Sequence, residues 1–302
     1  MSPRLSAGWR GAVFAVVLAS ISLGTSVCAR AAVPVSKGRN GPDVRSNAVL
    51  VIDRSDSSIV FARRADLVAP IASITKLMSA LVVLDGRQPL EELIEITSAD
   101  LSRGKGAYSR LAVGTRLSRG DLLRLALMSS ENRAAHALGR SYPGGERAFV
   151  RAMNAKAKTL GMTQSRFADP SGLSSDNVSS ARDLARLVIA SGRSATIREY
   201  STSRHHTVRI GRTMVEFRNT NSLVANTSWN ITVQKTGYLS EAGQCLVMQT
   251  LIEERPVIIV LLNSFGKYTR VADAKRIRQW MESRHTRSLA RTGAVTGSSF
   301  AN

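Results

Sequence analysis

Ser73 and Lys76 are three residues apart in a segment with helical periodicity, which places both side chains on one face of the predicted helix. A serine hydroxyl is a weak nucleophile until a base removes its proton. A lysine can be that base when burial and nearby positive charge lower its pKa. The pair therefore indicates an acyl-enzyme mechanism, with Ser73 as nucleophile and Lys76 as base. Alone the spacing is weak, because a helix cap followed by a surface lysine gives the same pattern.

A second motif, Ser130-Glu131-Asn132, follows one apolar helical stretch and precedes another, so we expect it in a tight turn between two helices. In that position Ser130 can pass a proton to a leaving amine. The Asn132 amide offers both a donor and an acceptor to a substrate peptide. Serine and asparagine are also common as simple turn formers, which is the alternative interpretation.

A third motif, Lys235-Thr236-Gly237, is expected at the end of a predicted strand. A lysine beside a hydroxyl suits a substrate carboxylate, and Gly237 lets a substrate backbone come close. The backbone N–H groups of Tyr238 and Ser73 can form an oxyanion hole, whose donors typically contribute about 3–4 kcal/mol each to the transition state. The alternative is an ordinary strand end and turn. Together the three motifs, in this order, match the trio of penicillin-interacting enzymes far better than chance.

The elements that must position these motifs change in type along the chain. The order of strands, helices, strands and a final helix predicts an α+β fold, in which early and late strands form one antiparallel sheet with helices packed on it. A mainly helical insertion over about 90–198 separates the two groups of strands. The expected strands are 48–52, 58–62, 206–210, 214–217, 231–235, 244–251 and 256–262, and the expected helices include 73–85, 118–128, 143–161, 180–191 and 268–285.

The N-terminal segment has the pattern of a secretory signal peptide. Arginines precede a short apolar core, and Ala29-Arg30-Ala31 resembles a cleavage site, so we assign 1–31 to the signal peptide. We expect a linker over 32–45, a peptidase domain over 46–285 and a disordered tail over 286–302. The expected location is the periplasm, with no transmembrane segment in the mature chain. An uncleaved N-terminal anchor is the alternative.

The chain is strongly basic. Its formal charge is +20, and +17 remains when the three arginines of the signal peptide are removed. Such a surface suits an anionic partner, and export together with only 5% aromatic residues argues against nucleic acid and for a cell-wall polymer. General basicity of the host's proteins is the alternative. The four histidines show no metal-ligand spacing, so we expect no metal and no cofactor, and Cys245 lies in an apolar run typical of a buried thiol.

At this point the sequence resembles the D-alanyl-D-alanine carboxypeptidase/endopeptidase family, the low-molecular-mass penicillin-binding proteins. The segment 70–78 around Ser73 is very similar to that family's nucleophile segment, and 167–173 and 179–185 add further likeness. The resemblance covers roughly 48–280. It implies a serine β-lactamase/transpeptidase-like fold, peptidoglycan stem peptides and cross-links as substrates, and β-lactams as covalent inhibitors of Ser73.

The resemblance also implies a role for each motif residue. Ser73 attacks the carbonyl of a D-alanine, Lys76 is its base, and Ser130, supported by Lys235, passes the proton to the leaving group. Asn132 holds the acyl side. Lys235 and Thr236 meet the carboxylate beyond the cut bond.

Several activities remain open within this family. Many of its carboxypeptidases carry an extra C-terminal β-domain and an amphipathic anchor, and the residues after the closing helix could form neither. This favours the endopeptidase branch, which cuts D-alanyl–diaminopimelate cross-links, with a D-alanyl-D-alanine carboxypeptidase as the alternative. A β-lactamase is disfavoured because the loop 167–173 has Asp169 followed by Pro170 and lacks the E-x-x-L-N pattern with which class A β-lactamases activate the deacylating water. A non-catalytic murein-binding protein would not need Ser73 and Lys76 together.

Overall fold

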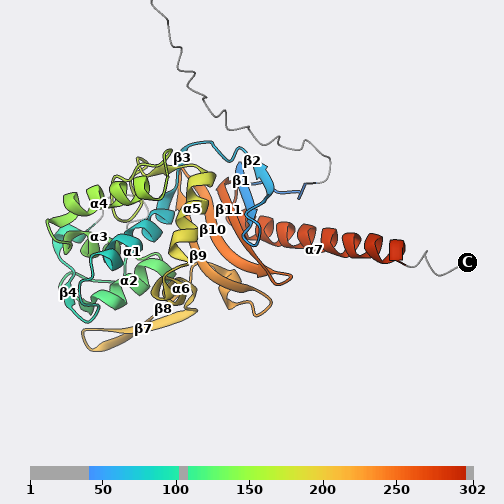
Figure 1. The fold of residues 1–302 in the computed structure, drawn as a ribbon. Helices are drawn as coiled ribbons and strands as arrows, with labels where there is room; N and C mark the ends of the chain where they lie inside the picture. Colours follow the sequence, from blue (N-terminus) through green and yellow to red (C-terminus); the bar gives the residue numbers. More distant parts are fainter. Residues whose placement is uncertain (1–40, 102–107, 297–302) are drawn as a thin grey trace, which may run out of the picture. The chain divides into compact units, whose positions relative to one another are not determined.

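The structure is a computed structural model that describes residues 41–101 and 108–296, with side chains to residue 284. Within these residues a five-stranded antiparallel sheet has the order β2-β1-β11-β10-β9 (Figure 1). Its strands are β1 (Ala48–Asp53), β2 (Ile59–Arg63), β9 (Asn230–Leu239), β10 (Gly243–Ile252) and β11 (Arg255–Ser264). The predicted signal peptide and most of the predicted linker lie outside the described residues.

Both faces of the sheet are buried, which explains why β1 and β11 are nearly continuous apolar runs. Side chains alternate between faces along a strand. Leu50 and Val260 therefore enter one hydrophobic cluster, whereas Val49 and Leu261 enter the other. β1 pairs with β11 in the register Val49↔Leu261, so the first strand of the domain lies next to the last.

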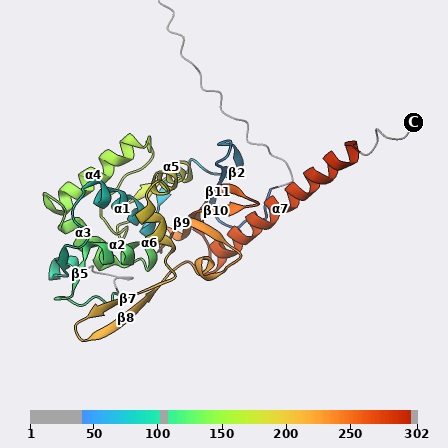
Figure 2. The ribbon, with the colours of Figure 1, turned by 60° about the horizontal axis from the view of Figure 1, so that its bottom comes forward.

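Helices cover the two faces unequally. The helix α5 (Ala181–Ser191) packs on the face that contains Leu50 and Val260, and α1 (Thr75–Asp85) packs against α5. The other face is covered by α7 (Thr269–Thr296) through Ala274 and Ile277 (Figures 1 and 2). The remaining helices of the first group are α2 (Arg119–Met128), α3 (Asn132–Arg140), α4 (Gly145–Thr159) and α6 (Ala195–Thr202).

Short elements connect these layers. Three small two-stranded sheets pair β3 (Ala69–Pro70) with β6 (Val178–Ser179), β4 (Leu93–Glu95) with β5 (Arg116–Ser118), and β7 (His205–Ile210) with β8 (Thr213–Arg218) within the described residues. Single 3₁₀ turns are η1 (Ala72–Ile74), η2 (Ser98–Asp100) and η3 (Ser222–Ala225).

The predicted α+β class, with early and late strands in one antiparallel sheet, is confirmed. Two predicted helix starts are also found: Ser118 caps α2 by accepting from the Asp121 N–H, and Ser180 caps α5 by accepting from the Asp183 N–H. Among the described residues, no helix combines the length and the apolar character that crossing a membrane requires.

Three boundaries differ from the prediction. Ser73 lies in η1, before α1 begins at Thr75. The motif that starts at Lys235 was expected at a strand end, but β9 continues to Leu239 because Gly237 and Tyr238 pair with β10. The closing helix extends to Thr296, so the expected disordered tail is wrong for 286–296. That stretch contains leucine, alanine and arginine but no proline, so the helix can propagate.

Candidate active site

Lys76 lies at the centre of the candidate site and is only 1% exposed. Its Nζ is 2.8 Å from Ser73 Oγ, 2.7 Å from Asn132 Oδ1 and 2.6 Å from the Ser171 carbonyl oxygen. Burial lowers the pKa of the Lys76 ammonium to about 7, although the negative charges of Asp169 and Glu131 act in the opposite direction. A large fraction of Lys76 is therefore neutral at physiological pH.

These three contacts determine which way a neutral Lys76 points. A neutral amine keeps two N–H donors and one lone pair. Asn132 Oδ1 and the Ser171 carbonyl can only accept, so they take the two donors, and the lone pair is left for the Ser73 hydroxyl. The arrangement turns a helical spacing of three residues into a base aimed at a nucleophile.

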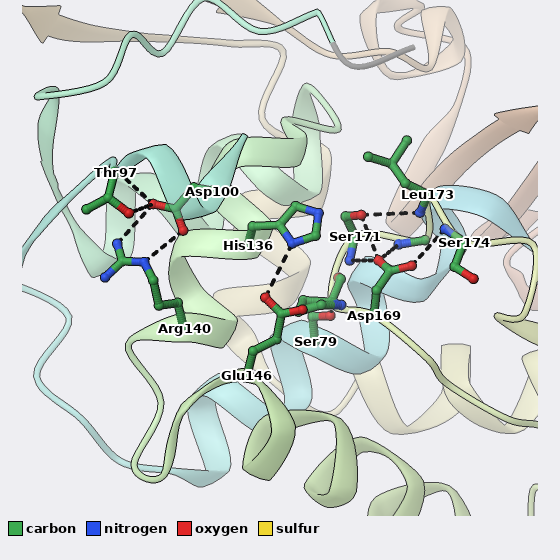
Figure 3. A network of polar contacts seen from close by, with 12 residues as sticks. Ser79, Thr97, Asp100, His136, Arg140, Glu146, Asp169, Ser171, Leu173 and Ser174 are labelled. Atoms are coloured by element: carbon green, nitrogen blue, oxygen red, sulfur yellow. Dashed lines mark hydrogen bonds and ion pairs between the residues drawn. The ribbon is translucent and has the colours of Figure 1, made fainter. Parts of the chain in front are cut away.

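The loop that follows α4 supplies the Ser171 carbonyl and is organised by Asp169 (Figure 3). The Asp169 carboxylate accepts five hydrogen bonds of 2.6–2.8 Å, from the Ser171 N–H and hydroxyl, the Gly172 and Ser174 N–H groups and the Asn177 amide. Burial by itself raises a carboxyl pKa, but the bonds from Ser171, Ser174 and Gly172 outweigh it, and the pKa of Asp169 falls below its usual value. Asp169 therefore holds the loop as a carboxylate.

Two further contacts hold this loop against the nucleophile. Ser79 of α1 donates to the Pro170 carbonyl oxygen at 2.6 Å (Figure 3). Gly172 has φ +81°, and a Cβ there would lie 2.0 Å from the Ala72 carbonyl oxygen. Only glycine fits this position, since both the backbone conformation and the space exclude a side chain.

The turn between α2 and α3 carries the second motif, as expected. Ser130 has φ +61°, an uncommon left-handed conformation for a serine, and such strain is often found at functional sites. The Glu131 side chain caps α3 by accepting from the Arg133 N–H, and it is only 8% exposed. Burial raises the pKa of Glu131, against hydrogen bonds from Ser109 and Arg133 that lower it. Asn132 thus begins α3, with its side chain on Lys76.

The third motif lies along β9, the edge strand of the sheet, which contacts η1. Lys235 is fully buried and donates to the Thr236 carbonyl oxygen at 2.9 Å. Burial, and then the positive charges of Lys76 and Arg270, hold the pKa of Lys235 well below its usual value. A Cβ on Gly237 would lie 2.9 Å from the Ile71 carbonyl oxygen and 3.3 Å from Ser73 N, so β9 approaches the nucleophile as closely as a glycine allows.

Tyr238 follows Gly237 in β9 and pairs with Gln244. Its side chain is 62% exposed, so the candidate contribution of this residue is its backbone N–H rather than its phenol. All eight candidate residues of the three motifs therefore lie on five elements: η1, α1, the α2–α3 turn, α3 and β9.

Several groups that position these residues were not predicted from the sequence. Arg270 of α7 donates to the Gly237 carbonyl oxygen at 2.9 Å and also contacts Gln244. The Thr220 and Thr236 hydroxyls are 2.6 Å apart. The Ser171 carbonyl is a backbone group. None has a local signal: an arginine on a closing helix resembles a surface residue, and a carbonyl has no sequence signature.

Other titratable groups make contacts of their own. His136 is on α3, with Nδ1 3.5 Å from Glu146 Oε2 (Figure 3). Arg140 of the same helix pairs with Asp100 at 2.8 Å. Cys245 is buried, as predicted, and burial raises the pKa of its thiol to about 11, so it stays protonated.

Comparison with known proteins adds independent information. A family model described as D-alanyl-D-alanine carboxypeptidase, peptidase S11, matches residues 35–266. A D-alanyl-D-alanine endopeptidase of Pseudomonas aeruginosa is 48% identical over 270 residues, which is 87% of this chain and 86% of that protein. One of Escherichia coli is 48% identical over 244 residues, 80% and 79% of the two chains. The crystal structure of the Streptomyces K15 DD-transpeptidase superposes with a TM-score of 0.74 at 26% identity, covering 80% of this chain and 98% of that one.

Proposed function

The chain belongs to the D-alanyl-D-alanine carboxypeptidase family, peptidase S11, and on that premise we propose that it is an endopeptidase that hydrolyses D-alanyl–diaminopimelate cross-links in peptidoglycan. The chemistry rests on one observation, the buried Lys76 amine with a pKa of about 7 at 2.8 Å from the Ser73 hydroxyl. The choice of substrate is supported by the two 48% identical relatives, both named D-alanyl-D-alanine endopeptidase.

The proposed first half-reaction forms an acyl-enzyme. Neutral Lys76 takes the proton of Ser73, whose oxygen attacks the D-alanine carbonyl. The Ser73 and Tyr238 N–H groups bind the oxyanion. Ser130 gives its proton to the departing diaminopimelate amine as the C–N bond breaks. The proton that Lys76 took from Ser73 then restores the Ser130 hydroxyl, next to the positive charge of Lys235. The products are an ester on Ser73 and a free amine.

The second half-reaction releases the enzyme. Water attacks the ester carbonyl while Lys76 takes one of its protons. The bond between the carbonyl carbon and Ser73 Oγ then breaks, Lys76 returns the proton to Ser73, and the product leaves as a D-alanine carboxylate after losing its other proton to solvent. Asn132 orients the acyl side of the substrate, and Lys235 with Thr236 binds the carboxylate beyond the cut bond.

β-Lactams should acylate Ser73 by the same steps. Hydrolysis of that acyl-enzyme should be slow, because the carboxylate of the nearby loop, Asp169, is saturated by five hydrogen bonds and is not available to activate water. We propose the periplasm as the location, with a loose association with the membrane as a variant. Peptidoglycan as substrate and the signal-peptide pattern over 1–31 support it.

A D-alanyl-D-alanine carboxypeptidase is the second candidate. The description of the matching family supports it, as does a D-alanyl-D-alanine carboxypeptidase of Haemophilus influenzae that is 26% identical over 251 residues. Digestion of purified murein, followed by mass analysis of the products, separates the two. The expected result is that cross-linked dimers disappear much faster than D-alanine is released from pentapeptides, and release of free D-alanine alone would replace our proposal by the second candidate.

Fluorescent penicillin tests the acyl-enzyme directly. We expect a covalent label on the wild-type protein and none on Ser73→Ala, whose missing hydroxyl leaves the fold unchanged. Equal labelling of the two proteins, or no labelling of a folded wild type, would show that Ser73 is not the nucleophile.

A further inference from the structure

A pocket of about 370 Å³ opens beside the Ser130 turn. Its described lining comes from three segments, 108–110, 129–131 and 216–218, the last of which is the end of β8. Ser130 lines this pocket and also belongs to the turn that carries Asn132 to Lys76. The pocket therefore borders the candidate active site at Ser130.

Two arginines converge on this pocket. Arg110 donates to the Glu216 carbonyl oxygen at 2.7 Å, and its guanidinium lies 3.9 Å from the centre of the Phe217 ring. Arg218 donates through Nε to Glu216 Oε1 at 2.7 Å and is 83% exposed. Both arginines thus contact Glu216, Arg110 at the backbone carbonyl and Arg218 at the carboxylate, and each keeps further N–H donors, since an arginine carries five.

Arg110 is the cation that this pocket leaves without an ionic partner among the described residues. Glu216 is paired with Arg218. Among the described residues, the recorded partners of Arg110 are a carbonyl oxygen and a ring, and neither balances its charge. Glu131 also lines the pocket, but its carboxyl is largely buried and is hydrogen-bonded to Ser109 and to the Arg133 N–H. Paired guanidinium groups with free donors are typical of carboxylate recognition.

The position of the pocket decides which part of a substrate it can receive. In the proposed mechanism Ser130 protonates the leaving amine, so the departing part of the substrate extends from Ser130. A single D-alanine ends at the carboxylate that Lys235 and Thr236 bind. A cross-link continues into a second stem peptide, which carries further carboxylates and needs more room.

We propose that this pocket is a subsite for the departing stem peptide of a cross-link, in which Arg110 and Arg218 bind a carboxylate other than the one beside the cut bond. The proposal rests on the proposed endopeptidase function and extends it. The subsite selects cross-linked peptide over terminal D-alanine, because only the cross-link supplies an occupant.

The test compares Arg110→Gln, Arg218→Gln and the double variant with Arg212→Gln. Arg212 is exposed in the turn between β7 and β8 and does not line the pocket. Its substitution therefore removes the same charge from the same hairpin at a site outside the pocket. The substrates are a purified cross-linked dimer, the same dimer with the more distant carboxylates of its departing stem amidated, and an uncrosslinked pentapeptide stem. Rates are expressed per penicillin-labelled site, so a variant that folds poorly does not distort them.

We expect the double variant to lose about 10- to 100-fold in kcat/KM on the dimer, the loss typical of charge-assisted hydrogen bonds. The wild type should lose a similar factor in kcat/KM when the dimer is amidated. The double variant should cut the amidated dimer almost as fast as the unmodified dimer. D-alanine release from the pentapeptide should change as little as in Arg212→Gln. Arg218→Lys should recover part of the activity that Arg218→Gln loses, because it restores the charge.

Two outcomes would overturn the subsite. One is a double variant that cuts dimers as fast as Arg212→Gln does, and the other is an equal loss on dimer, amidated dimer and pentapeptide. Arg218→Gln keeps the test sharp if Arg110→Gln disturbs folding, since Arg218 is an exposed side chain. A wild type that labels with penicillin but leaves dimers intact would refute the endopeptidase itself, and the subsite with it.

Discussion

Lys76 shows how a single side chain acquires its chemistry from its surroundings. A surface lysine is protonated at neutral pH and cannot accept a proton. Here burial lowers the pKa to about 7, and Asn132 and Ser171 direct the amine toward Ser73. Removing water thus does two things: it produces the neutral base and keeps its hydrogen-bonding pattern fixed.

The rate of acylation by penicillin should therefore rise with pH through an apparent pKa near 7 and then level off, because the reactive form of Lys76 is the neutral one, which predominates above its pKa. Stopped-flow labelling across pH 5–9 measures this profile. A rate that falls with rising pH over the same range would exclude Lys76 as the base.

Lys76→Ala should lower the acylation rate by about 10²- to 10⁴-fold, the usual contribution of a general base. The matched control is Lys158→Ala, which removes an exposed lysine of α4 and should leave the rate unchanged. Labelling kinetics at fixed pH provide the comparison, and a Lys76→Ala variant as fast as the control would contradict the assignment.

At the scale of elements, the loop after α4 works as a rigid support for α1. Asp169 holds that loop through five hydrogen bonds, and the loop in turn presents the Ser171 carbonyl to Lys76. The position of Lys76 therefore depends on Asp169, although no hydrogen bond joins the two side chains in the structure.

Asp169→Asn should destabilise the protein by about 3 kcal/mol, because a neutral amide cannot accept all the donors that now face the carboxylate, and buried donors are left unpaired. Penicillin acylation should slow as the Ser171 carbonyl shifts. Asp176→Asn is the control: it lies in the same loop, and its pair with Arg166 is exposed. Thermal unfolding and labelling rates measured together decide the point. Equal behaviour of the two variants would show that Asp169 does not organise the loop.

The approach of β9 to η1 is the second element-level feature. Gly237→Ala would press a methyl group against the Ile71 carbonyl, so strand and nucleophile must separate. We expect acylation to fall about 100-fold, as when one oxyanion donor is lost, with a much smaller change in melting temperature. An unchanged acylation rate would mean that this edge of β9 does not contribute to the oxyanion hole.

At the scale of the whole molecule, contacts between residues distant in sequence hold the two ends of the domain together. Asp273 of α7 is fully buried and accepts from the Arg45 N–H, the Ser46 N–H at 2.7 Å and the Ser46 hydroxyl at 2.6 Å. Asp273 thereby holds the segment that precedes β1 against α7, the last helix of the chain. Two of these residues were expected at the boundary of a linker, but here they are held by the domain.

Asp273→Ala should lower stability by about 3 kcal/mol, since it leaves buried N–H groups unpaired. For a domain of this size that corresponds to a fall in Tm of roughly 6–12 °C. Glu282→Ala, on the same helix, removes a partly exposed ion pair with Arg278 and should cost at most about 1 kcal/mol. Calorimetry should record a single transition for each protein, and equal melting temperatures would contradict the anchoring role of Asp273.

Much of the fold was predictable from the sequence because the signals were local. Alternating and continuous apolar runs predicted β1, β10 and β11, and Ser118 and Ser180 marked the starts of α2 and α5. Strand and helix ends were less certain. The end of β9 depends on pairing with β10, and the extent of α7 depends on helix propagation that no capping residue interrupts.

By itself the sequence determined the types and the order of the reactive groups: Ser73, Lys76, Ser130 and Lys235 in motifs whose chemistry is complementary. Only the tertiary structure decided that Lys76 is buried and directed by Ser171, that Arg270 supports the Gly237 backbone, and that two arginines line one pocket with Ser130. The physical reason is that a pKa and a hydrogen bond depend on which groups exclude water and face one another. Those neighbours come from segments up to 106 residues apart, where periodicity and spacing carry no information.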